Sequence, residues 1–337
     1  MKKAVFLFIV GALAVAAAIF VPRYLQEYKK SVAEKSVLYI PLNSTYEQML
    51  DTVSNAVADM NSFKKVAQRA NLNEKFKPGR YIFTPDKTNK ELVRTLAMGW
   101  ESPMMLTLSG NIRGLEKLSG ILGKKLAADS AAFMEYLCME DVWKSCGFNK
   151  ENFMGMFLPN TYEVYWTITP EKFVERMKKE YEKFWNTERA AKAQQIGLTP
   201  QEVSVLASIV CEETNYGPEM PRVAGVYMNR LKKGMKLDAD PTVKFALGDP
   251  TIKRILFRHL KVDSPYNTYK NQGLPPGPIT IPSIKGIESV LGYEKHNYLY
   301  FCASPDMDGT HRFARTLVEH NRNAREYQAK LNKMKIR

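Results

Sequence analysis

Two adjacent glutamates, Glu212 and Glu213, end a segment that is otherwise almost entirely apolar. Before it, Thr199, Pro200 and Glu202 form the pattern of a capping box with proline at the first helical position, so they predict a helix start. The run of apolar residues that follows predicts a helix packed inside the fold. Burial and the negative end of the helix dipole both disfavour a carboxylate, so we expect a raised carboxyl pKa. Such a group can protonate a leaving oxygen, as cleavage of an acetal linkage requires.

The same pair of glutamates also fits two solvated side chains at a helix C-terminus. Helical periodicity leaves the choice between Glu212 and Glu213 open. Downstream, a second helix is expected to end at Gly234, and 235–242 is expected to be a loop carrying acidic and hydroxyl side chains. A polar aromatic strip at 266–269 then precedes a turn rich in proline and glycine. Tyrosine, asparagine and threonine side chains of this kind bind sugar hydroxyls and N-acetyl groups.

The N-terminus carries a segment that can cross a membrane. After Met1-Lys2-Lys3 come eighteen uncharged residues, Ala4 to Val21, about 27 Å of helix at ~1.5 Å per residue. Ala14-Val15-Ala16 has the spacing of a signal-peptide cleavage site, but the apolar run continues beyond it. We therefore expect an uncleaved single-pass anchor within residues 1–30, with its helix at about 4–22. The two lysines predict a cytoplasmic N-terminus in the inner (cytoplasmic) membrane, with the rest of the chain on the periplasmic, extracytoplasmic side.

Composition sets further bounds on the class of protein. A chain of 337 residues with 45% hydrophobic and 25% charged residues is typical of a globular protein, and its length favours two domains. The net charge of +14 is dispersed and no nucleic-acid motif accompanies it, so we expect no nucleic-acid partner. The four cysteines lack zinc-type spacing, and we expect neither a metal nor a cofactor. Cys138 and Cys146 are candidates for a disulfide, whereas Cys211 is expected to be a free thiol.

The expected fold class is α+β and mostly helical. Residues 36–103 predict a small βααβα-like module. Its strands are expected at 37–40 and 81–83, a helix is expected to open at Ser44 and Glu47, and its last helix is expected to run from Thr88 to Gly99. Its expected role is positioning or binding. Residues 104–337 predict a mainly helical catalytic domain built around the buried helix, with its core at 198–337. Leucine and aromatic stripes at helical spacing in its first half are expected to be core.

Several motifs in this order resemble the YceG-like family of membrane-anchored endolytic murein transglycosylases. They are Ala207–Val210 with Glu213-Thr214, Val226–Arg230, Gly234–Leu237 with Asp240–Thr242, Tyr266–Tyr269, Gly273–Gly277, and Lys77–Tyr81 with Phe83–Pro85. The resemblance implies that the glutamate directly before the threonine, Glu213, is catalytic. It also implies that 36–103 is a LysM-like subdomain and that 104–337 is the YceG-like catalytic domain. Cys211 departs from the pattern, because many members have a further glutamate there. His311 with Phe313 matches a family position, for which we expect a structural role.

The mechanism that the resemblance implies needs one carboxyl group. Glu213 would protonate the oxygen between N-acetylmuramic acid and N-acetylglucosamine, then take the proton of the muramic 6-hydroxyl as that oxygen closes onto C1, giving 1,6-anhydro ends. The candidates that would orient the sugar are Asn229, Asp240, Thr242, Tyr266, Asn267 and Tyr269. For each of them, a hydrogen bond that only braces a loop is the alternative. Implied partners are peptidoglycan glycan strands and peptidoglycan synthases in the same membrane, whose products the enzyme would terminate.

Two other functions fit the sequence. One is a peptidoglycan hydrolase (muramidase) in which Asp238 or Asp240 supplies a second carboxylate beside Glu213. The other is a non-catalytic, anchored scaffold that uses the LysM-like module to hold glycan. A hydrolase of the Ser/His/Asp type is less favoured, because none of the four histidines accompanies a nucleophile-elbow motif.

Overall fold

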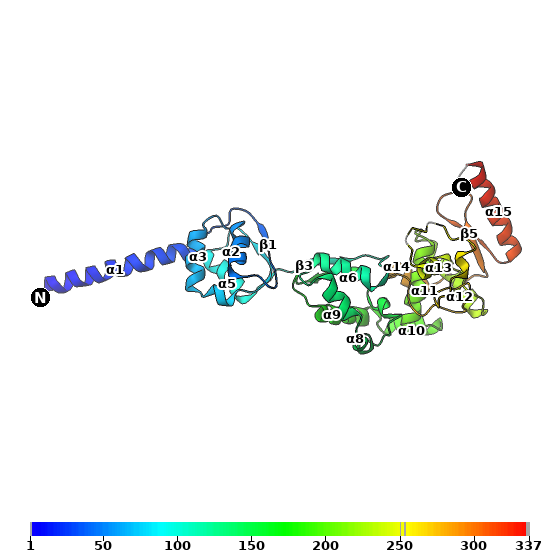
Figure 1. Ribbon diagram of the computed structural model, residues 1–337, viewed down its shortest axis with the longest axis horizontal. Helices are drawn as coiled ribbons and strands as arrows, with labels where there is room; N and C mark the ends of the chain where they lie inside the picture. Colours follow the sequence, from blue (N-terminus) through cyan, green and yellow to red (C-terminus); the bar gives the residue numbers. More distant parts are fainter. Residues whose placement is uncertain (1, 250, 253, 335–337) are drawn as a thin grey trace. The chain divides into compact units, whose positions relative to one another are not determined.

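The computed structural model describes residues 2–249, 251–252 and 254–334, and its chain divides into two compact units (Figure 1). The first unit runs to Leu106 and also takes in Lys125–Ala128 and Glu163–Ile168. The second consists of Thr107–Lys124, Asp129–Tyr162 and the chain from Thr169 onward. Helices predominate and the described strands are short, so the predicted mostly helical α+β class is confirmed.

Helix α1 (Lys2–Tyr28) is the apolar N-terminal segment. By length and composition it can cross a membrane, since its most apolar window has a mean hydropathy of 2.9. It is longer than the expected span of about 4–22, because the chain stays helical through Pro22. The last turns of α1 contact α5 within the first unit: the Asn89 side-chain amide donates to the Gln26 carbonyl at 3.0 Å, and Lys90 Nζ lies 3.1 Å from Glu27 Oε2.

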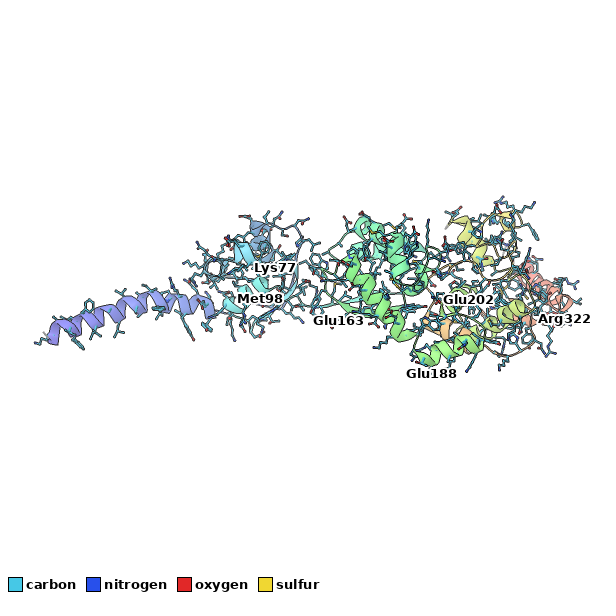
Figure 2. The ribbon with its side chains drawn as sticks, turned by 90° about the horizontal axis from the view of Figure 1, so that it is seen from below. Lys77, Met98, Glu163, Glu188, Glu202 and Arg322 are labelled. Carbon is cyan, nitrogen blue, oxygen red and sulfur yellow. The ribbon has the colours of Figure 1, made fainter. Side chains whose placement is uncertain are left out.

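The first unit contains β1 (Ser36–Ile40), α2 (Tyr46–Ser54), α3 (Met60–Arg69), α4 (Leu72–Lys75), β2 (Gly79–Phe83) and α5 (Asn89–Met98). The two strands pair antiparallel, with Val37 opposite Ile82. The short helix α4 was not predicted. At the end of α5, the Lys77 N–H donates to the Leu96 carbonyl at 3.0 Å, and Figure 2 labels Lys77 and Met98 there.

Two capping boxes in the first unit test the sequence pattern. The one at Thr88 and Glu91 forms as predicted. The one predicted at Ser44 and Glu47 is wrong by one residue, because Thr45 is the N-cap and its hydroxyl accepts from the Gln48 N–H at 3.3 Å. A serine and a threonine stand side by side here, and each is followed three residues later by a glutamate or glutamine, so the pattern fits either register.

The rest of the chain contains β3 (Met104–Leu108), α6 (Gly114–Lys125), α7 (Ser130–Leu137), α8 (Glu140–Ser145), η1 (Phe153–Met156), β4 (Asn160–Val164), α9 (Pro170–Phe184), α10 (Thr187–Gln195), α11 (Pro200–Glu213), α12 (Met220–Lys232), α13 (Asp240–Leu247), η2 (His259–Lys261), α14 (Ile284–Leu291), β5 (Tyr300–Ala303), β6 (His311–Ala314) and α15 (Leu317–Lys333). The leucine and aromatic stripes predicted as core lie buried in α6 and α9. The four cysteines are free thiols in this structure, Cys138 and Cys146 included.

Helix α11 lies at the centre of the second unit, packed against α12 and α14. The predicted capping box opens it: the Thr199 hydroxyl accepts from the Glu202 N–H at 3.2 Å, and the Glu202 carboxylate accepts from the Thr199 N–H at 2.8 Å (Figure 2 labels Glu202). Every residue from Val203 to Val210 is buried. The buried Ser208 hydroxyl has a hydrogen-bond partner within the fold, because it accepts from the Ile279 N–H at 3.0 Å. The last helical residue, Glu213, is thereby held at a fixed place.

Two local features bring other segments to the end of α11. Gly234 has φ +64°, which lets the chain leave α12 as predicted. The loop expected at 235–242 is shorter than predicted, because α13 starts at Asp240 with Pro241 in its first turn. The antiparallel hairpin of β5 and β6 places His311 opposite Ala303.

Candidate active site

The Glu213 carboxyl group is half-buried at the C-terminal end of α11. Its nearest polar partner is Tyr227 of α12, whose hydroxyl donates to Glu213 Oε1 at 2.5 Å. Tyr227 is 1% exposed and its ring packs edge-on against Phe301 of β5. The hydroxyl is therefore held rigidly against one oxygen of the carboxyl group.

The pKa of Glu213 is raised from 4.5 to about 7, chiefly because burial disfavours its charged form. The negative charges of Asp240 and Glu212 raise the pKa further, whereas the Tyr227 hydrogen bond and the positive charge of Arg230 lower it. At neutral pH, Glu213 is therefore close to half protonated. A carboxyl group in that state can both give and take a proton.

The neighbouring Glu212 has a different environment. Its carboxylate forms an ion pair with Arg113, on the other side of the helix end. Its side chain lines a separate hollow of about 620 Å³ together with Cys211 and Lys244, and Glu213 does not line that hollow. Of the two glutamates, Glu213 is thus the one that accepts a hydrogen bond from the buried Tyr227 hydroxyl.

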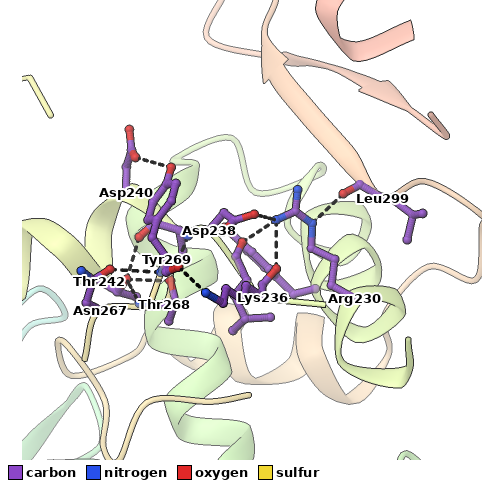
Figure 3. Close-up of polar contacts among 12 residues, drawn as sticks. Arg230, Lys236, Asp238, Asp240, Thr242, Asn267, Thr268, Tyr269 and Leu299 are labelled. Atoms are coloured by element: carbon purple, nitrogen blue, oxygen red, sulfur yellow. Dashed lines mark hydrogen bonds and ion pairs between the residues drawn. The ribbon is translucent and has the colours of Figure 1, made fainter. Parts of the chain in front are cut away.

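Arg230, one turn beyond Tyr227 on α12, fixes the loop that faces Glu213 (Figure 3). Its guanidinium group donates to the carbonyls of Leu237 and Leu299, both at 2.7 Å, and to Asp238 Oδ2 at 3.2 Å. Arg230 itself is 8% exposed. These bonds hold the chain between α12 and α13 in place, although Asp238 adopts a left-handed backbone with φ +47°.

Asp240 and Tyr269 form the second polar contact of the site. The Tyr269 hydroxyl donates to Asp240 Oδ1 at 2.7 Å, as Figure 3 shows. Burial is the main cause that raises the pKa of Tyr269, and the hydrogen bond to Asp240 adds to it, so this hydroxyl stays protonated. Both side chains line the same hollow as Glu213.

Glu213 lies where two hollows meet. One, of about 450 Å³, is lined by Tyr227, Arg230, Asp240 and Tyr269 among others. The other, of about 590 Å³, is lined by residues 214–216 and by the 303–311 segment of the β5–β6 hairpin. Both hollows share Glu213, Ala303 and His311. We call the two hollows together the Glu213 groove.

The structure brings two of the six proposed sugar-orienting residues, Asp240 and Tyr269, into the Glu213 groove. The other four make internal hydrogen bonds. The Asn229 amide donates to the carbonyls of His296 and Tyr298, at 2.7 and 3.0 Å. The Tyr266 hydroxyl donates to the Glu151 carbonyl at 3.4 Å.

Thr242 and Asn267 are fully buried. The Thr242 hydroxyl donates to the Ala239 carbonyl at 2.7 Å, and the Asn267 amide donates to the carbonyls of Leu260 and Val262, at 2.9 and 2.8 Å. They brace the loop that carries Tyr269 and the start of α13, which is the alternative that the sequence left open for each of them.

Sequence reasoning missed Tyr227, Arg230 and His311 as residues of the groove. The sequence did contain a signal for Tyr227 and Arg230. They lie three positions apart on the otherwise apolar side of α12, and both are buried. His311 was singled out only by the resemblance and was expected to have a structural role, but it lines both hollows of the groove. Among the residues that the structure describes, no group of three or more histidine, cysteine or acidic side chains is placed to hold a metal ion.

Comparison with known proteins places the chain in a family. The model of the YceG-like family matches residues 38–326, most of the sequence. The chain belongs to the YceG-like family. A crystal structure of a putative yceG-like protein from Listeria monocytogenes has a similar fold, with a TM-score of 0.58 and 26% sequence identity over 86% of this chain and 98% of that one.

Curated relatives of this YceG-like chain carry the name endolytic murein transglycosylase. The Bacillus subtilis (strain 168) protein is 42% identical over 127 residues, which is 38% of this chain and 34% of that protein. The proteins of Streptococcus pneumoniae strains D39 and R6 are 31% identical over 187 residues, 53% of this chain and 33% of theirs. The matched part thus spans about a third of the length of these relatives.

Proposed function

We propose that this chain is an endolytic peptidoglycan lytic transglycosylase that cleaves the bond between N-acetylmuramic acid and N-acetylglucosamine without consuming water. The observation that carries the proposal is the position of Glu213, a carboxyl group with a pKa of about 7 at the junction of two hollows. Two hollows that both border the acid offer room for the sugars on either side of the cleaved bond, as an enzyme that cuts inside a strand requires. The names of the curated relatives support the same activity.

The reaction needs one acid that later acts as a base. Protonated Glu213 gives its proton to the oxygen that links muramic C1 to the next sugar, and the bond from C1 to that oxygen breaks. The muramic 6-oxygen then bonds to C1, and its proton passes to the Glu213 carboxylate. The products are a 1,6-anhydro end and a free 4-hydroxyl group, and Glu213 is protonated again. Because the nucleophile belongs to the substrate, positioning supplies a large part of the rate.

The polar contacts around Glu213 suit these two states. The Tyr227 hydroxyl stabilises the carboxylate that forms after the first proton transfer. Asp240, with Tyr269 bonded to it, puts a negative charge in the groove on the side of α13, where it stabilises the positive charge of an oxocarbenium-like sugar. Asp240 and Tyr269 are the residues that we propose contact the sugar on this side.

The test is to digest isolated sacculi with the full chain in detergent and to identify the new sugar ends by mass spectrometry. We expect muramic ends in the anhydro form, 18 Da lighter than reducing ends, about the mass of one water. Glu213→Gln should remove cleavage. The matched control is Glu212→Gln, the same substitution on the neighbouring residue, which should retain it. Unchanged cleavage by Glu213→Gln would remove this residue from the mechanism.

The hydrolase remains the second candidate, because Asp238 and Asp240 both line the hollow that contains Glu213. A muramidase uses one of them to activate water or to attack C1, and it leaves reducing muramic ends. Asp238 is already bonded to Arg230, and Asp240 to Tyr269. Predominantly reducing ends from the parent protein would establish the hydrolase and reject our proposal.

We further propose that α1 anchors the enzyme in the inner (cytoplasmic) membrane, with the chain after α1 on the extracytoplasmic side. Its length and apolar composition support this, and so does the placement of Lys2 and Lys3 before the apolar run. There the enzyme would cut nascent strands made by membrane-bound synthases and so end their growth, while residues 36–103 would act as a LysM-like glycan-binding subdomain. Recovery of the full chain in the soluble fraction of lysed cells would contradict the anchor.

A further inference from the structure

A buried carboxyl group, Glu219, links the residue after Glu213 to the start of β6. Glu219 is 6% exposed and directly precedes α12. The backbone N–H of His311 donates to its Oε1 at 2.9 Å, and His311 Nδ1 lies 2.7 Å from its Oε2. The hydroxyl of Thr214, which follows Glu213 in sequence, lies 3.5 Å from the same Oε2. One carboxylate therefore fixes His311 relative to the end of α11.

These contacts determine which nitrogen of His311 carries the proton in the neutral ring. A buried carboxylate needs hydrogen-bond donors, so the proton lies on Nδ1 and is donated to Glu219. The other nitrogen, Nε2, is then an acceptor. Within the described part of the chain, Nε2 has no hydrogen-bond partner. It is also not buried, because the buried polar side-chain atoms without a partner do not include it. His311 therefore has one nitrogen committed to the protein and one open to solvent.

The open side of His311 belongs to the Glu213 groove. Its side chain is 16% exposed, and it lines both of the hollows that meet at Glu213. The edge-on packing of its ring with Phe301, with centroids 5.2 Å apart, keeps the ring in this orientation. An acceptor nitrogen is thus held in the groove at the junction that the proposed acid also occupies.

A muramic residue inside a glycan strand offers such an acceptor few donors. Its oxygens at C1 and C4 are in glycosidic bonds, the one at C3 is in an ether, and C2 carries an N-acetyl group. The 6-hydroxyl is therefore its only O–H group, and it is also the nucleophile of the proposed reaction. While Glu213 still holds its proton, Oε1 accepts the hydrogen bond from Tyr227 and the other oxygen carries the proton that goes to the leaving oxygen, so neither is well placed to accept from the 6-hydroxyl. A different acceptor has to orient the 6-hydroxyl before the bond breaks.

We propose that His311 is this acceptor: Nε2, oriented by Glu219, receives a hydrogen bond from the muramic 6-hydroxyl and holds its oxygen toward C1. The inference rests on the function proposed above and adds a residue that touches the substrate. By holding the internal nucleophile in place, His311 favours ring closure over attack by water at C1. Once Glu213 has become a carboxylate, the hydroxyl turns its hydrogen from Nε2 to Glu213, and the proton passes to that carboxylate as the 6-oxygen bonds to C1.

Two substitutions test the pair in the full chain. His311→Phe keeps a flat ring beside Phe301 and removes the acceptor. Glu219→Gln keeps the imidazole ring, but it exchanges the donor and acceptor roles of the two ring nitrogens. The amide oxygen stays on the His311 backbone N–H and the amide nitrogen then faces Nδ1, so the proton moves to Nε2. The control is His259→Gln, which changes a histidine of η2 that does not line either hollow of the groove.

The readouts are the cleavage rate on sacculi and the ratio of anhydro to reducing muramic ends. We expect both variants to lose about tenfold to a hundredfold in rate and to shift the ratio toward reducing ends, because water then competes with a poorly held hydroxyl. The control should change neither. The ratio is a property of each turnover, so it is independent of how much of a variant is folded.

The outcomes separate this inference from the proposed function. If the parent protein makes no anhydro ends, the transglycosylase itself is rejected. If it does, and folded Glu219→Gln keeps the parent's rate and ratio, only the role of His311 is rejected. A lower rate with an unchanged ratio also overturns that role, since it means that the pair only supports the fold.

Discussion

Replacing Tyr227 with phenylalanine tests the physical origin of the raised pKa of Glu213. Burial raises this pKa, and the hydrogen bond from Tyr227 is the largest effect that opposes burial. Removing the hydroxyl leaves burial less opposed, so the pKa of Glu213 should rise above about 7. The ring of Tyr227 is buried against Phe301, and phenylalanine keeps that packing.

The size of the change follows from the strength of one hydrogen bond. A hydrogen bond to a charged group contributes about 1.5–3 kcal/mol. A pKa shift of one unit corresponds to a change of about 1.4 kcal/mol in the free-energy difference between the protonated and charged forms. Water entering from the groove replaces part of the lost interaction, so we expect the pKa of Glu213 to rise by about one unit.

The assay is the rate of glycan cleavage as a function of pH. Protonated Glu213 is the active form, so the rate falls as the pH rises through its pKa. We expect this decline near pH 7 in the parent and about one unit higher in Tyr227→Phe. Tyr266→Phe is the matched control, because the Tyr266 hydroxyl contacts the Glu151 carbonyl instead of the groove. A decline in Tyr227→Phe that stays in place or moves to lower pH would refute the electrostatic reasoning.

Three further predictions follow from the same contacts. Asp240→Asn removes a charge that raises the pKa of Glu213, so the decline should move to lower pH by less than about one unit while the ends stay anhydro. Glu213→Gln should raise the free energy of unfolding at pH 8 by up to ~3 kcal/mol in urea titrations and leave it unchanged at pH 4. Thr199→Ala should lower the unfolding free energy by about 1 kcal/mol in the same titrations, without moving the pH at which the rate declines.

The sequence predicts best where local chemistry decides the structure. The start of α11 follows from Thr199, Pro200 and Glu202, since a cap, a proline and a reciprocal acidic residue favour one register. The same rule fails by one residue at Thr45, where two hydroxyl residues compete for the cap. The loop predicted at 235–242 was too long, because Pro241 lies in the first turn of α13, a position where proline favours a helix start.

The candidate site is less predictable, because its contacts join residues that are far apart in sequence. Tyr227 reaches Glu213 only through the packing of α12 on α11, and no spacing in the chain contains that information. His311 is 98 residues from Glu213 and lines the same groove only because the β5–β6 hairpin folds back on α12. The polar types of Asn267 and Thr242 suggested sugar contacts, yet buried loops need the same side chains to satisfy their own backbone.

The burial that makes Glu213 a proton donor also lowers the stability of the folded protein at high pH. Its pKa in the folded protein, about 7, lies above the ordinary value of 4.5. Below pH 4.5 the carboxyl group is neutral in both the folded and the unfolded chain, so burial of a charge has no effect on stability. As the pH rises toward 7, the unfolded chain loses this proton first, and the folded state becomes less stable by up to ~3 kcal/mol. Glutamine cannot ionise, so Glu213→Gln separates the two roles: the variant should be the more stable protein at pH 8 and should have lost the acid that cleaves glycan.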